Sequence, residues 1–575
     1  MDNKLISASL LVLASLSPTA TVAQTQSHQT HAADFYYYRG KKVLLKLAER
    51  TLAAKLRPGV RYDHKFSKLK NYFAELGIQP FNDRERVIVS KSTTEMDAAS
   101  AAIEPGIATK EIYQVPVYQL GELKLVLQNE VIVQFKPDVS EENREELLRK
   151  FTSGFKEVAA GQYVLALGNP ENTLFTSNTL QNSRYVDFAE PNFLVLTPQS
   201  SKTKWKAPVA KPKPNGPLDA NPPYPSDPLF AQQWSLSNQL GDQGQGVTGA
   251  DIRIKEAWKI NQGSKDIRVA VLDDGVDITH PDLKSSIAWD NGSVVQWDAI
   301  DAVAHDGTSG APNASTVWHQ VSASDSHGTN VAGVIAAQTN NGIGLAGIAP
   351  NVKIIPIRMG SADLEAKGHW TTPLLVGLAI RKAVVLGADV INASWPVDQS
   401  DSVAAAVAYA LAQGRDVGGI KKGVVMVFAA GNGDGDDGVV YPAQLAASLP
   451  VIAVGATNSW DVVKTKQTAD GEDWWYSGTG PAVSLVAPGV GIVTTNPSVT
   501  GSLYIEDFNG TSSAAPHVAA VAALILSQGK NCTASDVKSI LINTADKLRG
   551  QTSRTDDAGS GRLNALAALK GIHCR

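Results

Sequence analysis

A hydroxyl group in the local setting of a nucleophile occurs near the C-terminal end of the chain, in the segment Gly510–Pro516 (GTSSAAP). Ser512 follows a Gly-Thr pair and precedes the apolar run Val518–Leu526. The pattern predicts Ser512 at a helix N-terminus, where free backbone N–H groups and the helix dipole favour a developing oxyanion. Serine is also a preferred N-cap residue, so this segment taken alone favours an ordinary helix cap.

Two adjacent carboxylates follow a predicted strand. Ile267–Leu272 is a short apolar run typical of a buried strand, and it ends in Asp273-Asp274-Gly275. A carboxylate at the C-terminal end of a central strand lies where an open α/β sheet places its active site. Asp and Gly are also common turn residues, and taken alone they favour a turn. Because side chains alternate along a strand, only one of the two carboxylates can serve a given site.

A histidine begins a third segment, Asp325–Gly333 (DSHGTNVAG). His327 stands at the expected start of a helix of small residues, which can pack closely against its neighbours. An isolated histidine is more often structural than catalytic. A histidine beside glycine at a helix start does not fill a core, and this position suits a group that must meet a partner.

At these motifs the chain resembles the subtilisin-like serine proteases, the subtilase superfamily. The matching segments are VLDDG (271–275), HGT (327–329) and GTS (510–512) with Pro516. They follow the order Asp, His, Ser that subtilisin has. The resemblance extends over about residues 225–570 and implies a parallel α/β sheet with helices on both faces.

The resemblance implies hydrolysis of peptide bonds in polypeptide substrates through an acyl-enzyme. Ser512 Oγ is a weak nucleophile that needs an adjacent base. His327 would take its proton and later deliver it to the leaving amine. Asp273, which the resemblance favours over Asp274, would hold the imidazole in one tautomer and stabilise the imidazolium.

A second strand and turn, Phe428–Asn432, resembles the family's oxyanion-hole segment. The resemblance implies that Asn432 and the backbone N–H of Ser512 stabilise the oxyanion, and that Ala430 and Gly431 contact substrate. Asparagine between two glycines is by itself an ordinary turn residue.

The segment Val390–Ser394 resembles the strand that lines the family's substrate cleft, which implies substrate contact at Ser394. Trp395 and Pro396 follow, where many relatives have a small apolar residue and glycine. Ser513 replaces the methionine that is common after the nucleophile. The first departure leaves the substrate preference open.

A glycine-rich loop, Thr339–Leu345 (TNNGIGL), resembles the loop that holds the family's tight calcium ion. A mixture of carboxylate, amide and carbonyl oxygens suits Ca²⁺, which takes about 6–8 oxygen ligands. A plain β-turn is the alternative. The implied ligands are the carboxylate of Asp282, the side chain of Asn341, the backbone carbonyls of Thr339, Ile343 and Leu345, and an amide oxygen of Gln232 or Gln233.

Length and composition indicate several domains: the chain has 575 residues, of which 43% are hydrophobic and 19% charged. The net charge of −4 gives no reason to expect nucleic acid or an acidic membrane as a partner. Residues 1–23 have the pattern of a signal peptide. It contains Lys4, an apolar core over Leu5–Leu16 and a small-residue cleavage site at 21–23. We expect a secreted or periplasmic protein without a membrane anchor.

Two cysteines, Cys532 and Cys574, lie near the C-terminal end of the sequence. In an oxidising compartment they are expected to form a disulfide. Two free thiols are the alternative.

Residues 117–198 predict an α+β ferredoxin-like domain, which resembles the family's inhibitory propeptide. Strands are expected at 130–135, 163–167 and 186–189, a charged amphipathic helix after Ser140, and a second helix near 171–180. Such a domain would act as an intramolecular inhibitor. Residues 24–116 form an N-terminal pro-region of unknown role, with a Tyr-rich strand and a basic helix around Lys46–Lys55.

A Pro/Lys/Ser-rich linker, residues 199–224, is expected to carry the maturation cleavage. The catalytic domain then covers residues 225–575 and alternates strands with helices, which argues for a parallel sheet. Its predicted strands are 267–272, 352–357, 390–393 and 424–429, and its predicted helices are 374–386 and 402–412. The sequence thus predicts an exported, self-processed zymogen; the alternative is a pseudoprotease or a propeptide-locked binding protein.

Overall fold

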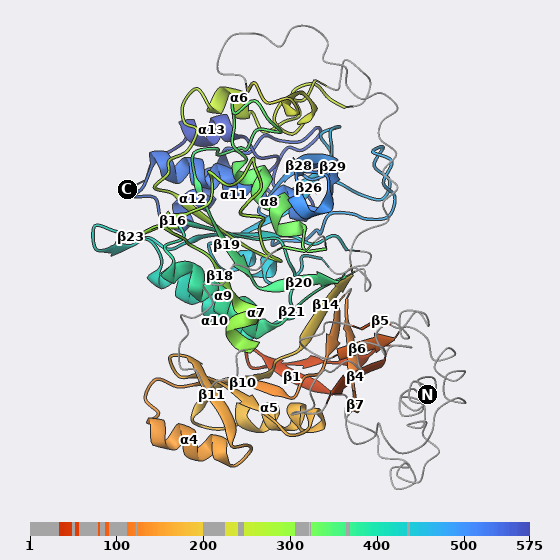
Figure 1. The fold of residues 1–575 in the computed structure, drawn as a ribbon, viewed down its shortest axis with the longest axis vertical. Coiled ribbons are helices and arrows are strands. Elements are labelled where there is room, and N and C mark those ends of the chain that lie inside the picture. The colour runs from red at the N-terminus through yellow and green to blue at the C-terminus, as the bar shows by residue number, and fades with distance from the viewer. Residues whose placement is uncertain are drawn as a thin grey trace. The chain divides into compact units, whose positions relative to one another are not determined.

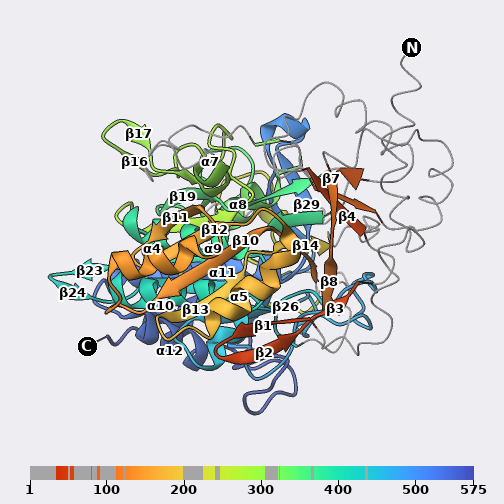
Figure 2. The same ribbon diagram turned by 90° about the horizontal axis from the view of Figure 1, so that it is seen from below.

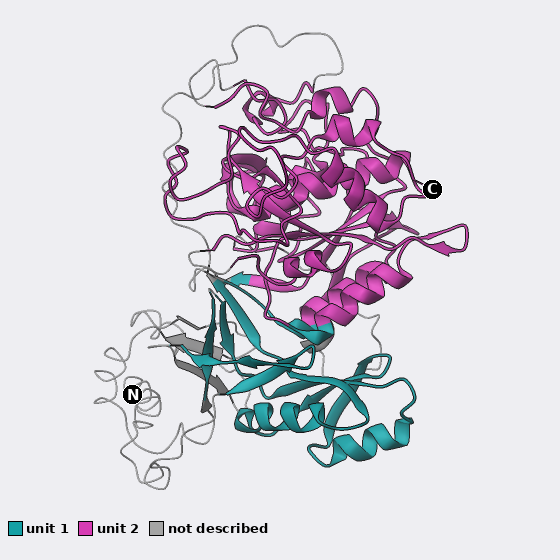
Figure 3. Ribbon diagram, turned by 180° about the vertical axis from the view of Figure 1, so that it is seen from behind, with its two compact units in different colours: residues 1–199, 362–374, 400–402 teal, residues 200–361, 375–399, 403–575 magenta. Residues whose placement is uncertain are grey.

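The structure of the protein is a computed structural model (Figure 1). It describes residues 34–48, 52–56, 79–80, 87–90, 112–121, 123–198, 225–239, 246–304, 321–322, 324–363, 368–433 and 438–574. The predicted signal peptide and linker lie outside these residues. The chain divides into two compact units (Figure 3). Unit 1 comprises residues 1–199, 362–374 and 400–402, and unit 2 comprises residues 200–361, 375–399 and 403–575.

Unit 2 is built on a seven-stranded sheet in which all paired strands are parallel, in the order β18-β19-β15-β22-β25-β26-β27. Its central strands are short apolar runs because helices cover both faces and leave no face to water. This confirms the predicted fold class, and the four predicted strands lie within one residue of those observed. The strands are β15 (Arg268–Asp273), β18 (Trp297–Asp298), β19 (Lys353–Arg358), β22 (Val390–Ala393), β25 (Val425–Ala429), β26 (Ile452–Thr457) and β27 (Leu485–Pro488).

Helices α8 (His327–Ala336) and α11 (Thr511–Gln528) cover one face of this sheet and share its core, and α9 (Pro373–Val385) and α10 (Asp401–Gln413) cover the other (Figure 1). Helix α11 is apolar over most of its length because it is buried on all sides. The remaining elements of unit 2 are α6 (Ile254–Ala257), α7 (Ala299–Ala304), α12 (Ala534–Asn543), α13 (Ala565–Lys570), the 3₁₀ turns Phe230–Gln232, Ala443–Ala447 and Ser498–Thr500, and the two-stranded pairs β16 (Trp289–Asp290) with β17 (Ser293–Val294), β23 (Asp416–Val417) with β24 (Ile420–Lys421), and β28 (Ile492–Thr495) with β29 (Tyr504–Phe508).

Unit 1 contains an α+β domain whose elements follow the order β-α-β-β-α-β, as in a ferredoxin-like fold. Its four strands form an antiparallel sheet in the order β11-β12-β10-β13, which is the ferredoxin-like order. Helices α4 and α5 lie on the same face of this sheet and bury Leu148 and Leu180 in one core (Figures 1 and 2). The elements are β10 (Glu130–Phe135), α4 (Glu141–Arg149), β11 (Gly154–Ala159), β12 (Gln162–Ala166), the 3₁₀ turn Pro170–Asn172, α5 (Thr173–Gln181) and β13 (Val186–Pro191).

A six-stranded sheet, in the order β20-β21-β14-β9-β8-β3, holds the segment that follows this domain. Strand β14 pairs antiparallel with β9 on one edge and with β21 on the other. The strands are β3 (Lys46–Leu47), β8 (Val117–Leu120), β9 (Leu123–Val126), β14 (Leu194–Pro198), β20 (Gly360–Asp363) and β21 (Gly368–Thr371).

The predicted basic helix around Lys46–Lys55 is wrong. This segment forms β3, which pairs with β8, and β4 (Leu52–Leu56), which pairs with β6 (Val87–Ser90) and β7 (Ile112–Val115). Partners far along the chain outweigh the helix propensity of Ala, Leu and Lys. The other strands are β5 (Gln79–Pro80), the predicted Tyr-rich strand β1 (Phe35–Tyr38), and its partner β2 (Lys41–Leu44).

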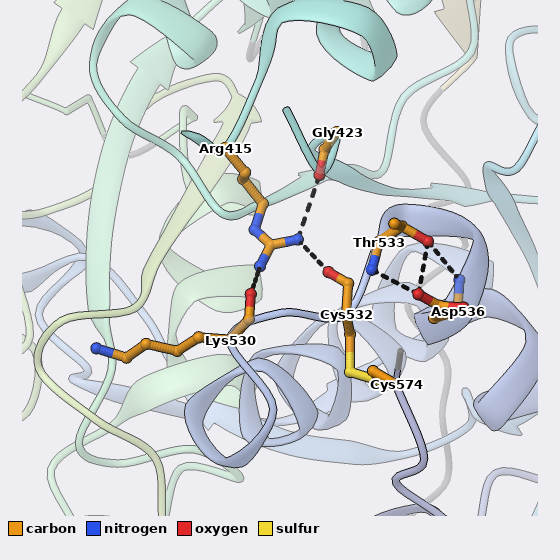
Figure 4. Close-up of a disulfide and its surroundings, with 7 residues drawn as sticks. All are labelled: Arg415, Gly423, Lys530, Cys532, Thr533, Asp536 and Cys574. Carbon is orange, nitrogen blue, oxygen red and sulfur yellow. Dashed lines mark hydrogen bonds between the residues drawn. A yellow bond between two sulfur atoms is a disulfide. The ribbon is translucent and has the colours of Figure 1, made fainter. Parts of the chain in front are cut away.

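Cys532 and Cys574 form a disulfide with a Cα–Cα distance of 4.9 Å (Figure 4). The buried guanidinium of Arg415 donates to the carbonyl oxygens of Lys530 and Cys532 at 2.9 and 2.8 Å. These bonds hold the turn before α12, whose N-terminus is closed by Thr533 in a capping box. Among the residues that the structure describes, none of the helices has both the length and the apolar composition needed to cross a bilayer.

Candidate active site

The imidazole of His327 is bonded to the carboxylate of Asp273. Asp273 is the last residue of β15 and is fully buried, and His327 is the first residue of α8. Nδ1 of His327 lies 2.9 Å from Oδ1 and 3.0 Å from Oδ2 of Asp273. A carboxylate accepts only, so Nδ1 carries the proton and Nε2 is left as the basic nitrogen.

Glycine at position 328 permits this contact. A Cβ atom there would lie 2.1 Å from the carbonyl oxygen of Gly275 and 2.8 Å from Cβ of Asp273. Any side chain would therefore push the first turn of α8 away from the end of β15. Packing therefore explains the glycine after the histidine, because the helix and the strand approach each other closely at this position.

Whereas Asp273 bonds to the imidazole of His327, Asp274 bonds to the backbone of α8. Its carboxylate accepts hydrogen bonds from the backbone N–H groups of His327 and Gly328, at 3.1 and 2.7 Å. It thereby satisfies two free donors in the first turn of α8. Burial, together with the neighbouring carboxylates of Asp273 and Asp325, raises the pKa of Asp274 well above its usual value. The strand alternation predicted that one carboxylate would be excluded from the histidine, but not that it would hold the helix.

Ser512 is the second residue of α11, and its side chain is buried among the segments around it, with 8% of the residue exposed. Its Oγ donates to the carbonyl oxygen of Ser394 at 3.1 Å, and Ser394 Oγ donates to the carbonyl oxygen of Ser512 at 3.1 Å. The second bond has a simple cause: Pro516, four residues on, has no N–H to give to that carbonyl. Ser394 supplies the missing donor.

Residues 394 and 395 join the two halves of the site. Ser394 is bonded to Ser512, and the indole of Trp395 donates to Oδ1 of Asp273 at 3.1 Å. The imidazole of His327 also stacks edge-on against Phe508, at a centroid distance of 5.4 Å. The adjacent residues Ser394 and Trp395 therefore connect Ser512 to the Asp273–His327 pair.

The side chain of Asn432 is oriented by Thr511. Oδ1 of Asn432 accepts from the backbone N–H of Thr511 at 2.7 Å and from its Oγ1 at 2.9 Å. The Nδ2 amide is therefore the end that can donate to a ligand. Gly510, which has a φ of 113°, leaves space for the Asn432 amide, because a Cβ atom at position 510 would lie 2.9 Å from Asn432 Nδ2. This local geometry was not predictable from the turn signal alone.

The predicted substrate contacts Ala430 and Gly431 continue from β25 into the Asn432 turn. Their carbonyl oxygens accept from the backbone N–H groups of Val440 and Gly478, at 2.9 and 2.7 Å. The Gly431 N–H donates to Thr511 Oγ1 at 3.0 Å. These bonds fix the backbone on both sides of the turn.

Two of the predicted calcium-binding residues, Asn341 and Leu345, donate hydrogen bonds to the buried carboxylate of Asp282. It accepts from Asn341 Nδ2 at 2.7 Å and from the backbone N–H of Leu345 at 3.1 Å. Burial raises the pKa of Asp282 to about 6. Asn341 Oδ1 accepts from the N–H of Ile343 at 2.9 Å, which closes the loop that Thr339 begins.

A second carboxylate, Asp227, was missed from the sequence. It is buried, and it accepts from the backbone N–H groups of Asn340 and Asn341 at 2.8 and 3.1 Å. The Gln233 amide makes two hydrogen bonds with the backbone of Ala346, at 2.8 and 2.9 Å. No cluster of three or more His, Cys, Asp or Glu side chains placed to hold a metal occurs in the described part of the chain.

Comparisons with known proteins show which family this chain is similar to. A sequence model of the subtilase family matches residues 264–561, just over half of the chain. The chain is 32% identical over 449 residues to the thermophilic serine proteinase of Bacillus sp. (strain AK1), covering 77% of this chain and 88% of that protein. It is 34% identical over 347 residues to thermitase of Thermoactinomyces vulgaris, covering 60% and 99%. The crystal structure of fervidolysin from Fervidobacterium pennivorans shares the fold, with a TM-score of 0.54 at 24% identity over 78% of this chain and 62% of that one.

Proposed function

The chain belongs to the subtilase family and is a subtilisin-like serine endopeptidase acting on polypeptides; we propose that Asp273, His327 and Ser512 are its catalytic triad. The observation that carries this proposal is the bond from His327 Nδ1 to both oxygens of a buried carboxylate. Ser394 and Trp395 tie Ser512 to that pair.

The proposed mechanism uses these residues in turn. Ser512 Oγ attacks the peptide carbonyl while His327 Nε2 takes its proton, and Asp273 stabilises the resulting imidazolium. Nδ2 of Asn432 and the backbone N–H of Ser512 bind the oxyanion. His327 then gives the proton to the leaving amine, and water hydrolyses the acyl-enzyme by the same route.

Hydrolysis of a peptide substrate by wild type and by Ser512→Ala tests the triad. A fluorophosphonate probe followed by mass mapping provides a second readout, because it labels only an activated serine. We expect turnover and a label on Ser512 in wild type and neither in the variant. A fully processed wild type with neither would favour the pseudoprotease or binding-protein alternative.

We further propose that the enzyme is made as an exported zymogen, with residues 117–198 as its intramolecular inhibitor and self-cleavage in 199–224. Two features of unit 1 support this role, because each bonds residues 117–198 to a segment from the predicted catalytic part of the sequence. Strand β14 is held on both edges, by β9 and by β21. Glu190 accepts from Ser400 Oγ at 2.7 Å and from the backbone N–H groups of Asp401 and Ser402 at 2.7 and 3.1 Å, at the start of α10.

Intact mass over time, beside Ser512→Ala, tests the self-processing. We expect wild type alone to lose a fragment that ends between about 193 and 225. If both proteins stay whole, either another protease matures this one or the fold serves as a binding module. If both are cut alike, the cleavage comes from a contaminant.

We propose that a calcium ion binds at the Thr339–Leu345 loop. The residues present fit such an ion, because Asp227 and Asp282 are buried carboxylates that accept hydrogen bonds from neutral backbone and amide N–H groups. Asn341 and the loop carbonyls add neutral oxygens of the kind that Ca²⁺ takes. The ion would offset the buried negative charge and hold the loop, and no step of hydrolysis passes through it.

Chelation with EDTA should lower the melting temperature of wild type, since an ion that binds only the native state stabilises it. Asp282→Asn should remove most of the difference between calcium and EDTA. An unchanged melting temperature on chelation would contradict the site.

A further inference from the structure

The indole of Trp395 makes a contact that the proposed mechanism does not use. Trp395 is buried, and its Nε1–H donates to Oδ1 of Asp273 at 3.1 Å, with His327 Nδ1 3.4 Å away. The indole and imidazole rings meet edge-on, at a centroid distance of 6.4 Å and an interplanar angle of 73°. The indole therefore lies against the Asp273–His327 pair.

Three N–H donors meet at one oxygen of Asp273. Oδ1 accepts from the backbone N–H of Asp274 at 2.9 Å, from His327 Nδ1 at 2.9 Å and from Trp395 Nε1 at 3.1 Å. The donors come from the residue after β15, from the first residue of α8 and from the segment after β22. A bond to an ionised acceptor is stronger than a neutral one, so each donor affects the charge that the carboxylate presents to the others.

The backbone around the indole is restrained on both sides. Ser394 is joined to Ser512 by two hydrogen bonds of 3.1 Å. Pro396 follows, and a residue before proline is restricted to extended conformations. The indole is thus held in a fixed relation to the nucleophile as well as to Asp273.

We propose that Trp395 is a positioning residue that fixes the Asp273 carboxylate and, through it, sets the basicity of His327. The inference rests on the proposed triad. An N–H donor stabilises the carboxylate charge and leaves less of it to stabilise the imidazolium. Removing that donor makes the imidazole hold its proton to a higher pH, and it frees one of the restraints on the orientation of Asp273.

The test is Trp395→Phe, which keeps an aromatic ring and deletes the N–H. The pH at which kcat/KM falls to half on the acidic side should rise by about 0.3–1 unit, and kcat at the plateau should fall about 3–10-fold. KM for a short peptide should change less than about two-fold, because the bond acts on the triad and not on substrate.

Trp258→Phe is the matched control. Trp258 is also buried, and its Nε1 donates to the carbonyl oxygen of Ile348 at 2.8 Å. It should lower the melting temperature without moving the acidic midpoint. An equal shift in both variants, or no shift in Trp395→Phe, would overturn the proposal.

A readout without turnover separates this proposal from the triad itself. In a Ser512→Ala background, the imidazole of His327 can be titrated by NMR with ¹⁵N-labelled histidine. Adding Trp395→Phe should raise that midpoint relative to Ser512→Ala alone, both proteins being compared as the unprocessed chain. An unchanged midpoint refutes the role of Trp395, whereas a wild type that is inactive after processing refutes the triad.

Discussion

Replacing Gly328 by alanine should separate His327 from Asp273. The added Cβ would lie 2.1 Å from the Gly275 carbonyl oxygen, and real Cβ atoms do not come closer than 3.0 Å. The first turn of α8 must therefore retreat by about 0.9 Å, because the obstacle is backbone. Such a shift takes the 2.9 Å bond between His327 and Asp273 to about 3.8 Å, beyond hydrogen-bond reach. A displacement near 1 Å costs about 10²-fold in turnover, and the crowding costs about 1–3 kcal/mol of stability.

The assay is kcat per active site with a peptide substrate, together with thermal unfolding of the same samples. Gly333→Ala is the matched control: it lies in the same helix, and its Cβ would meet Thr495 Oγ1 at 2.2 Å. That variant should lose comparable stability but much less turnover per folded molecule, since Gly333 is remote from the imidazole. If Gly328→Ala kept wild-type turnover, the close approach of α8 to β15 would not position the histidine.

Three further predictions concern Asn432, the disulfide and the buried His517. Asn432→Ala should lower kcat about 10²–10³-fold, the range known for such a donor in subtilisin, with KM little changed; a loss confined to KM would contradict the oxyanion role. Serine at both Cys532 and Cys574, which are 42 residues apart, should cost about 4 kcal/mol in urea unfolding, and an unchanged midpoint would be contrary to the chain-entropy argument. Burial lowers the pKa of His517 to about 4, so the unfolded chain binds the proton first as pH falls. From pH 7 to pH 5 this group alone should lower the free energy of unfolding by about 2 kcal/mol, which is measured as the difference in pH dependence between wild type and His517→Gln.

Local patterns in the chain were sufficient for most of the catalytic framework. The strands at 130–135 and 390–393 have the predicted bounds, and β15 ends at Asp273, one residue past its prediction. The reason is that a buried parallel strand must be a short apolar run, whatever its partners are. The helix of Ser512 begins at Thr511, so Ser512 lies at a helix N-terminus, as its Gly-Thr lead-in predicted.

Pairing between distant segments could not be read from the chain. The segment at Lys46–Lys55 has helix-forming residues, yet it forms β3 and β4, because strands at 87–90 and 112–120 supply the hydrogen bonds. Strand propensity depends on such partners more than on the residues themselves. For the same reason, the two-sided pairing of β14 was not foreseen.

Residue types and their local patterns identified the groups with the chemistry of the site: a hydroxyl at a helix start, an imidazole before a small-residue helix, and a carboxylate at a strand end. The roles of the polar groups around them depend on contacts between segments that are far apart in the chain. Asp274 holds the backbone of α8, Thr511 turns the Asn432 amide, and Trp395 bonds to Asp273 across 122 positions of sequence. Hydrogen bonds are directional and short, so their partners are chosen by the packing of helices on the sheet and not by local periodicity.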